Sequence, residues 1–226
     1  MLVKYSALVS DMSGKLNGSV ASRNRGGQYL RNKTTPLNPQ TAQQVQVRNQ
    51  FGIISGSWRA LTDNDRASWN DSAVNFPYTN VFGDVKYLSG FNLHQQLNTN
   101  LRLIGRPVLV NAPVPQEVPT VTVTVPLIDV SDEIMNANIM RSGIDVNGRV
   151  LIYATPGMSA GISYMKNRFR LIGHSNTTGV QNIWGMYVAE FGIPAVGTRI
   201  FIRVAGVRGD TGQVSPAVQS SGTVVA

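Results

Sequence analysis

The stretch "GRPVLVNAPVPQEVPT", residues 105–120, divides the sequence into two parts with different hydrophobic periods. Four prolines fall between Pro107 and Pro119, and proline-rich segments favour extended, semi-rigid linkers. Before this stretch, apolar residues recur at the spacing of helices, whereas after it they alternate with polar residues as in strands. The sequence therefore predicts an α+β chain in which residues 106–119 link a helical region to an all-β region.

The all-β region is predicted to cover residues 120–226. Its strand candidates, separated by turn signals, are "TVTVTVPL", "GRVLIYATP", "YMKNRFRLIG", "WGMYVAEFG", "GTRIFIRVAGVRG" and "QSSGTVVA". About seven short strands without helical segments are typical of a β-sandwich. We expect residues 113–226 to fold on their own, with no helix longer than a turn or two.

The end of this region carries a resemblance. The segment "TRIFIRVAGVRGDTGQVSPAVQSSGTVV", residues 198–225, resembles the late strands of fibronectin type III and related immunoglobulin-like modules. In these modules an aromatic strand with alternating apolar residues precedes a turn and a final strand containing Ser-Pro. The early tryptophan of such modules has no counterpart, since Trp184 lies elsewhere. The resemblance implies an immunoglobulin-like sandwich.

The helical region is predicted to cover residues 41–105. Helices are expected over 41–57 and from Thr62 onward, because Thr41 and Thr62 are good N-cap residues and Asp63 and Asp65 follow in a first turn. A third helix is expected over 87–103. The predicted apolar positions of the first and third helices are Val45, Val47, Phe51, Ile54, Leu88, Phe91, Leu97 and Leu101. Trp58, Leu61 and Trp69 are expected to pack between the first two helices.

Residues 1–40 are predicted to form a basic β-hairpin arm. The segments "GSVASR" and "GGQYLRNKT" are short strand candidates, and the intervening "NRGG" supplies the glycines of a tight turn. Pro36 and Pro39 then end strand pairing. Residues 1–60 contain eight Lys or Arg and one acidic residue, whereas residues 61–226 contain twelve and eleven. Most of the net charge of +8 therefore belongs to the N-terminal part.

This charge makes the arm the candidate docking site. The candidate partner-docking residues are Arg23, Arg25, Tyr29, Arg31, Lys33 and, beyond the arm, Arg48. Arginine binds protein carboxylates through two parallel hydrogen bonds, whereas the same cations could neutralise phosphates while Tyr29 stacks on a base. No recognised DNA- or RNA-binding motif contains these residues. We rank protein docking above nucleic-acid binding, with a merely solvated arm as the third reading.

The sequence offers little for catalysis, and we predict no enzymatic activity, no cofactor and no metal. There are no cysteines and only two histidines. His94 is expected to be a partly exposed helical residue and His174 to lie in a turn, and neither belongs to a metal or nucleophile motif. The start "MLVKYSALVSDMSGK" lacks the apolar core of a signal peptide, and no apolar run is long enough to span a membrane. We expect no membrane partner and synthesis in a reducing cytoplasm.

A second resemblance bears on function. The segments "GKLNGSVASRNRGGQYLRNKTTPLNPQTAQQVQVRNQF" and "SWRALTDNDRASWN", within residues 13–75, resemble a segment of uncharacterised proteins of tailed-phage genomes. This resemblance implies a non-enzymatic virion protein, made in the host cytoplasm and present in many copies or as a homo-oligomer. Its expected partners are the major capsid protein or neck and tail proteins. A capsid decoration (cement) protein is the first hypothesis; a head–tail connector, tail or fibre-attachment component is the second. A phage nucleic-acid-binding or packaging accessory protein is the alternative from another class.

Overall fold

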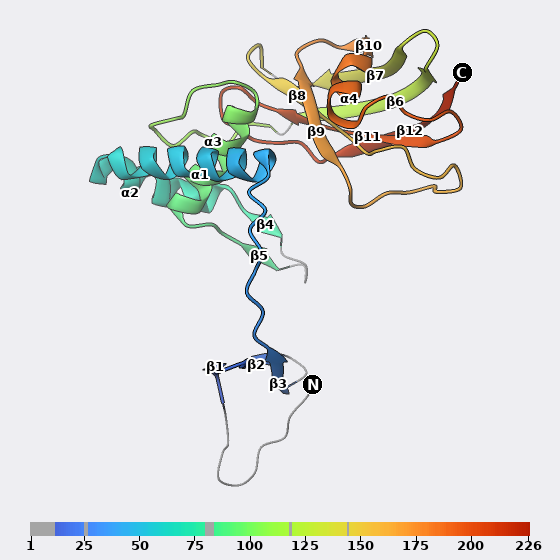
Figure 1. The fold of residues 1–226 in the computed structure, drawn as a ribbon. Helices are drawn as coiled ribbons and strands as arrows, with labels where there is room; N and C mark the ends of the chain where they lie inside the picture. The colour runs from blue at the N-terminus through green and yellow to red at the C-terminus, as the bar shows by residue number, and fades with distance from the viewer. Residues whose placement is uncertain (1–11, 25–26, 80–83, 118, 144) are drawn as a thin grey trace. The chain divides into compact units, whose positions relative to one another are not determined.

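The structure is a computed structural model that describes residues 12–24, 27–79, 84–117, 119–143 and 145–226 (Figure 1). The chain divides into two compact units, residues 1–45 and residues 46–226. Helices and sheets both occur, which confirms the mixed α+β composition. The predicted boundaries at residues 40, 105 and 119 remain predictions.

The arm is a three-stranded antiparallel sheet. Strands β1 (Gly14–Leu16), β2 (Ser19–Asn24) and β3 (Gly27–Asn32) follow one another in the order β1-β2-β3. The β2–β3 pairing, from Ser19 opposite Asn32 to Asn24 opposite Gly27, confirms the predicted hairpin. Strand β1, which was not predicted, extends this hairpin to a three-stranded sheet. Asn17 and Gly18 join β1 to β2, and Asn17 has the positive φ of 50° that tight hairpin turns require.

Three helices follow, and the first two begin directly after the predicted capping residues, Thr41 and Thr62. They are α1 (Ala42–Ala60), α2 (Asp63–Ser72) and α3 (Gly90–Leu103), with a short 3₁₀ turn, η1 (Ala73–Asn75), and two paired strands, β4 (Tyr78–Thr79) and β5 (Val85–Lys86), before α3. The amide of Gln44 donates to Thr41 Oγ1 at 3.3 Å, and the amide of Asp65 donates to Thr62 Oγ1 at 3.2 Å. Helix α3 begins three residues later than predicted because Ser89 caps it, accepting from the amide of Asn92 at 3.3 Å.

The predicted anchors of the helices are confirmed. Trp69 is fully buried in a cluster with Leu93 and Leu97, and Trp58 and Leu61 pack against this cluster. The proline-rich linker contacts the same helices, since Trp69 Nε1 donates to the carbonyl of Val110 at 2.8 Å.

The C-terminal region contains one continuous sheet. Its strands are β6 (Thr120–Asp129), β7 (Ile134–Ser142), β8 (Arg149–Ala154), β9 (Arg170–Ser175), β10 (Gly179–Asn182), β11 (Arg199–Val207) and β12 (Val218–Val225), in the order β10-β7-β6-β12-β11-β8-β9. All neighbours are antiparallel except β6 and β12, which pair in parallel over two residues at the ends of both strands. A bulge interrupts β6 between Thr124 and Leu127, around Pro126, which cannot donate to a ladder.

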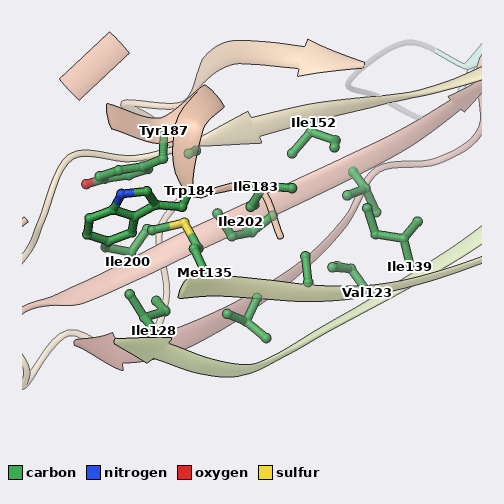
Figure 2. Packing of buried hydrophobic residues seen from close by; sticks show 14 of the residues in the cluster. Val123, Ile128, Met135, Ile139, Ile152, Ile183, Trp184, Tyr187, Ile200 and Ile202 are labelled. Carbon is green, nitrogen blue, oxygen red and sulfur yellow. The ribbon is translucent and has the colours of Figure 1, made fainter. Parts of the chain in front are cut away.

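The sheet curves around a single apolar core. Strands β7 and β8 are four positions apart, which corresponds to about 19 Å in a flat sheet. Nevertheless Met135 and Ile139 of β7 share a cluster with Ile152 of β8 and Ile202 of β11 (Figure 2). The two halves of the sheet therefore face each other, with this cluster between them.

One prediction for this region is wrong, and two of its strands were not expected. The segment "WGMYVAEFG" is a helix, α4 (Trp184–Phe191), rather than a strand. Trp184, Tyr187, Val188 and Phe191 recur at helical spacing. Trp184 and Tyr187 belong to the core cluster (Figure 2), and Val188 and Phe191 pack against it. Strand β10 was not predicted. Strand β7 was also not predicted, although its buried residues alternate with exposed or half-buried ones in the manner of a strand.

Helix α3 packs on the other face of the sheet. Leu101 and Ile104 form a cluster with Leu151 of β8 and Val207 of β11, and all four side chains are buried. The helices and the sheet therefore share an apolar contact within the unit that covers residues 46–226.

Candidate docking surface on the arm

The pairing of the arm strands decides which candidate residues lie together. Residues opposite each other in an antiparallel ladder point to the same side, and every second residue of a strand does so too. Arg31 lies opposite Val20, which in turn lies opposite Lys15. Tyr29 precedes Arg31 by two residues and therefore shares its face.

This face is basic. Lys15, Arg31 and Lys33 are exposed and line a hollow of about 330 Å³ together with Val20 and the segment 34–36. Tyr29 and Val20 are half-buried. Between Asp11 and Asp63 the sequence has no acidic residue, so no carboxylate of this segment neutralises the three cations. We call Lys15, Tyr29, Arg31 and Lys33 the basic face.

The other candidate residues lie elsewhere. Arg23 lies opposite Gln28, on the face that carries buried Ala21, and so points away from the basic face. Arg25 lies outside the described residues. Arg48 is exposed on α1, within the second unit. The structure therefore brings together Tyr29, Arg31 and Lys33.

Lys15 is a residue of the basic face that the sequence analysis missed. The signal was present, because Asn-Gly at 17–18 is a strong hairpin signal and places the preceding residues in a strand beside β2.

The histidines and aspartates that were considered for catalysis lie in separate elements of the fold. Asp65 accepts from the amide of Thr62 at 3.3 Å, and Asp63 pairs with Arg66 at 2.9 Å, so both belong to the start of α2. His174 lies on strand β9 rather than in a turn and is exposed. His94 is fully buried, contrary to the expected partial exposure, because α3 turns it toward Trp58 and Trp69. Across the described ranges, no three His, Cys, Asp or Glu side chains lie close enough to hold a metal ion.

No family model, no curated protein and no solved structure matches this chain. In the part of the chain that the structure describes, no helix combines the length and hydrophobicity needed to cross a bilayer.

Proposed function

We propose that this chain is a non-enzymatic structural protein of a tailed-phage virion that docks on a partner through the basic face of its arm. The observation that carries the proposal is the gathering of Lys15, Arg31 and Lys33 on one side of a small sheet. Among virion proteins, we favour a capsid decoration protein. The likeness of residues 13–75 to tailed-phage proteins supports the virion setting.

The chemistry of the arm favours a protein partner. Exposed cations attract acidic surfaces and raise encounter rates. An acidic surface of a neighbouring capsid, neck or tail protein fits this charge.

The C-terminal sheet supports an immunoglobulin-like sandwich as the second module. If β6, β7 and β8 are taken as strands A, B and C, then β10, β11 and β12 become E, F and G. The observed order then places A, B and E in one half and C, F and G in the other, which is the division found in immunoglobulin domains. The chain departs from the constant-type pattern at β9, which pairs with β8 instead of β10, and by having α4 before β11.

Nucleic-acid binding is the second candidate function, because Tyr29 shares a face with Arg31 and could stack on a base beside a neutralised phosphate. The two candidate functions differ in whether the chain binds duplex DNA. The same variants of the basic face can therefore be tested for incorporation into particles and for DNA binding.

The test compares the two faces of the arm. Particles are assembled with the variant Arg31→Glu/Lys33→Glu and, separately, with Arg23→Glu, and copies per particle are measured by quantitative mass spectrometry. We expect the double variant to lose at least about tenfold in occupancy and Arg23→Glu, on the opposite face, to remain near wild type. A spectroscopic unfolding curve checks that the second unit of each variant is folded.

Full occupancy of the Arg31→Glu/Lys33→Glu particles would reject the proposal. Tight binding of the wild-type chain to random duplex DNA, with affinity falling steeply as salt rises and lost in the same variant, would instead support the nucleic-acid function.

A further inference from the structure

The loop that joins β8 to β9, residues 155–169, is held on the sheet by two arginines of β11 (Figure 1). The Arg199 guanidinium donates to the carbonyl of Ile162 at 3.0 Å, and the Arg203 guanidinium donates to the carbonyl of Lys166 at 3.3 Å. Both arginines alternate along β11 with residues of the core cluster. They therefore lie on the face of the sheet that points away from this core.

The end of this loop combines aromatic and basic side chains in the segment "YMKNRFR", which begins at Tyr164. Tyr164 is 66% exposed, and Lys166 and Arg168 are exposed as well. Phe169 is half-buried, and the guanidinium carbon of Arg203 lies 3.8 Å from the centre of its ring. The four peptide units between Tyr164 and Arg168 span at most about 14 Å, so these side chains are close together. We call Tyr164, Lys166, Arg168 and Arg203 the loop patch.

The cations of the loop patch have no acidic partner. Residues 153–207 contain one acidic residue, Glu190, and five basic ones, which are Lys166, Arg168, Arg170, Arg199 and Arg203. Glu190 pairs with Arg170 at 3.1 Å. Across the described part of the chain, no carboxylate pairs with the three cations of the loop patch. The positive charge of this surface is therefore available to an anionic ligand.

The backbone of the loop patch is strained and held in place. Arg168 has a φ of 68°, in the left-handed region that residues other than glycine seldom adopt. Such a conformation persists only where the surrounding structure maintains it, and it is frequent at binding sites. Here the contacts of Arg203 with Lys166 and Phe169 hold the residues on both sides. A ligand would therefore meet cations on a loop that needs little further ordering.

The exposed side chains fit a single-stranded nucleic acid better than a protein. Stable protein interfaces have an apolar core, whereas the other apolar side chains of this segment, Met165 and Phe169, are half-buried. Lysine and arginine neutralise phosphates, and an exposed aromatic ring stacks on an unpaired base. In a duplex the bases are already stacked on one another, so Tyr164 would contribute little to binding.

We infer that the loop patch binds single-stranded nucleic acid, with Lys166 and Arg168 on phosphates, Tyr164 stacked on a base and Arg203 adding positive charge beside them. The loop patch belongs to the second unit, whereas the basic face of the arm belongs to the first. The inference therefore depends neither on the arm nor on the virion setting.

The test measures binding of the full chain to a fluorescent oligothymidylate of about 20 nucleotides, which exceeds the site size of a typical single-strand-binding module. A duplex of equal length and polyglutamate are the comparison ligands. Lys166→Gln/Arg168→Gln should lower the affinity for the single strand by about tenfold or more at low salt. The same variant should reduce the slope of log K against log salt by about 1.4, because two phosphate contacts are lost.

Two further variants separate stacking and position from charge. Tyr164→Ala should weaken binding of the single strand by about fivefold or more, leave its salt slope unchanged and leave duplex binding near wild type. The matched control Arg59→Gln/Lys86→Gln removes two exposed cations elsewhere in the same unit. It should change the affinity by less than about twofold, because salt screens distant charges. Thermal unfolding checks that each variant is folded.

Four results would overturn the inference. The first is no binding of the single strand to the wild-type chain, and the second is an equal loss in Arg59→Gln/Lys86→Gln. The third is a loss in Arg31→Gln/Lys33→Gln with none in the loop-patch variant, which would place nucleic-acid binding on the arm. The fourth is polyglutamate bound as tightly as the single strand with no effect of Tyr164→Ala, which would assign the loop patch to an acidic protein.

Discussion

His94 is an ionisable side chain held between two indole rings. Its ring centroid lies 5.3 Å from that of Trp58 and 5.0 Å from that of Trp69. Among the described residues neither ring nitrogen has a hydrogen-bond partner, and burial lowers the pKa of His94 below its usual value. The charged groups of the helices around it are Arg48 and Arg59 on α1, Asp63, Asp65, Arg66 and Asp71 on α2, and Arg102 on α3. The Arg66 guanidinium donates to the carbonyl of Trp58 at 3.4 Å and pairs with Asp63 at 2.9 Å, so its charge is compensated and burial is the cause of the lowered pKa of His94.

The first prediction is that the full chain loses stability as the pH falls below about 6.5, the ordinary pKa of histidine. In the unfolded chain His94 then takes up a proton, whereas in the folded chain its lowered pKa keeps it neutral, so acid favours unfolding by up to about 1.4 kcal/mol per pH unit. Urea unfolding from pH 7.5 to 5 measures this slope. His94→Leu should remove most of it, and His174→Gln, at the exposed histidine, should not. Equal slopes in wild type and His94→Leu would contradict the prediction.

Helix α4 shows why element type was hard to predict in one place and easy in others. Its sequence is rich in aromatic and β-branched residues, which favour strands, yet its apolar residues have helical spacing and fit over the core. At α2, by contrast, Thr62 and Asp65 specify a capping box locally, and the helix start was predicted correctly. Local hydrogen bonds can be inferred from neighbouring residues. Burial against distant strands depends on contacts that a local pattern does not contain.

The second prediction tests the helical state of α4. Gly185 lies within the helix, is exposed, and has no atom within 4 Å of the position where a Cβ would be added. Gly185→Ala should stabilise the chain by about 0.5–1 kcal/mol, because alanine has the higher helix propensity. Gly90→Ala is the contrasting substitution, since its Cβ would approach the backbone nitrogen of Asn70 to 2.6 Å and should destabilise the chain. Thermal unfolding of both variants provides the comparison; destabilisation by Gly185→Ala would argue that the segment is not helical.

At the scale of the whole chain, the change of hydrophobic period at residues 105–120 located the start of the sheet correctly, since β6 begins at Thr120. The hydrophobic period could not show that the linker packs against both the helices and the sheet. Leu109 of the linker packs against the helical cluster and also against the cluster that contains Leu151 and Val207. The basic face was only partly predictable for a similar reason. Its charges are evident in the sequence, but the separation of Arg23 from Arg31 follows from strand register.

The last prediction concerns the independence of residues 113–226. We expect this fragment to keep its sheet and α4, because the core between the two halves of the sheet draws on β6, β7, β8, β11, β12 and α4, all of which it contains. It should nevertheless be less stable than the full chain, since Leu151 and Val207 lose their cover from Leu101 and Ile104, and each apolar side chain returned to water costs about 1.5–3 kcal/mol. Leu151 and Val207 form an apolar face on the isolated fragment, and such a face promotes aggregation. The variant Leu151→Thr/Val207→Thr should therefore be more soluble than the unmodified fragment. Circular dichroism and denaturant unfolding decide the matter: an unfolded or largely helical fragment, with or without the threonine substitutions, would show that the sheet requires the helices to fold.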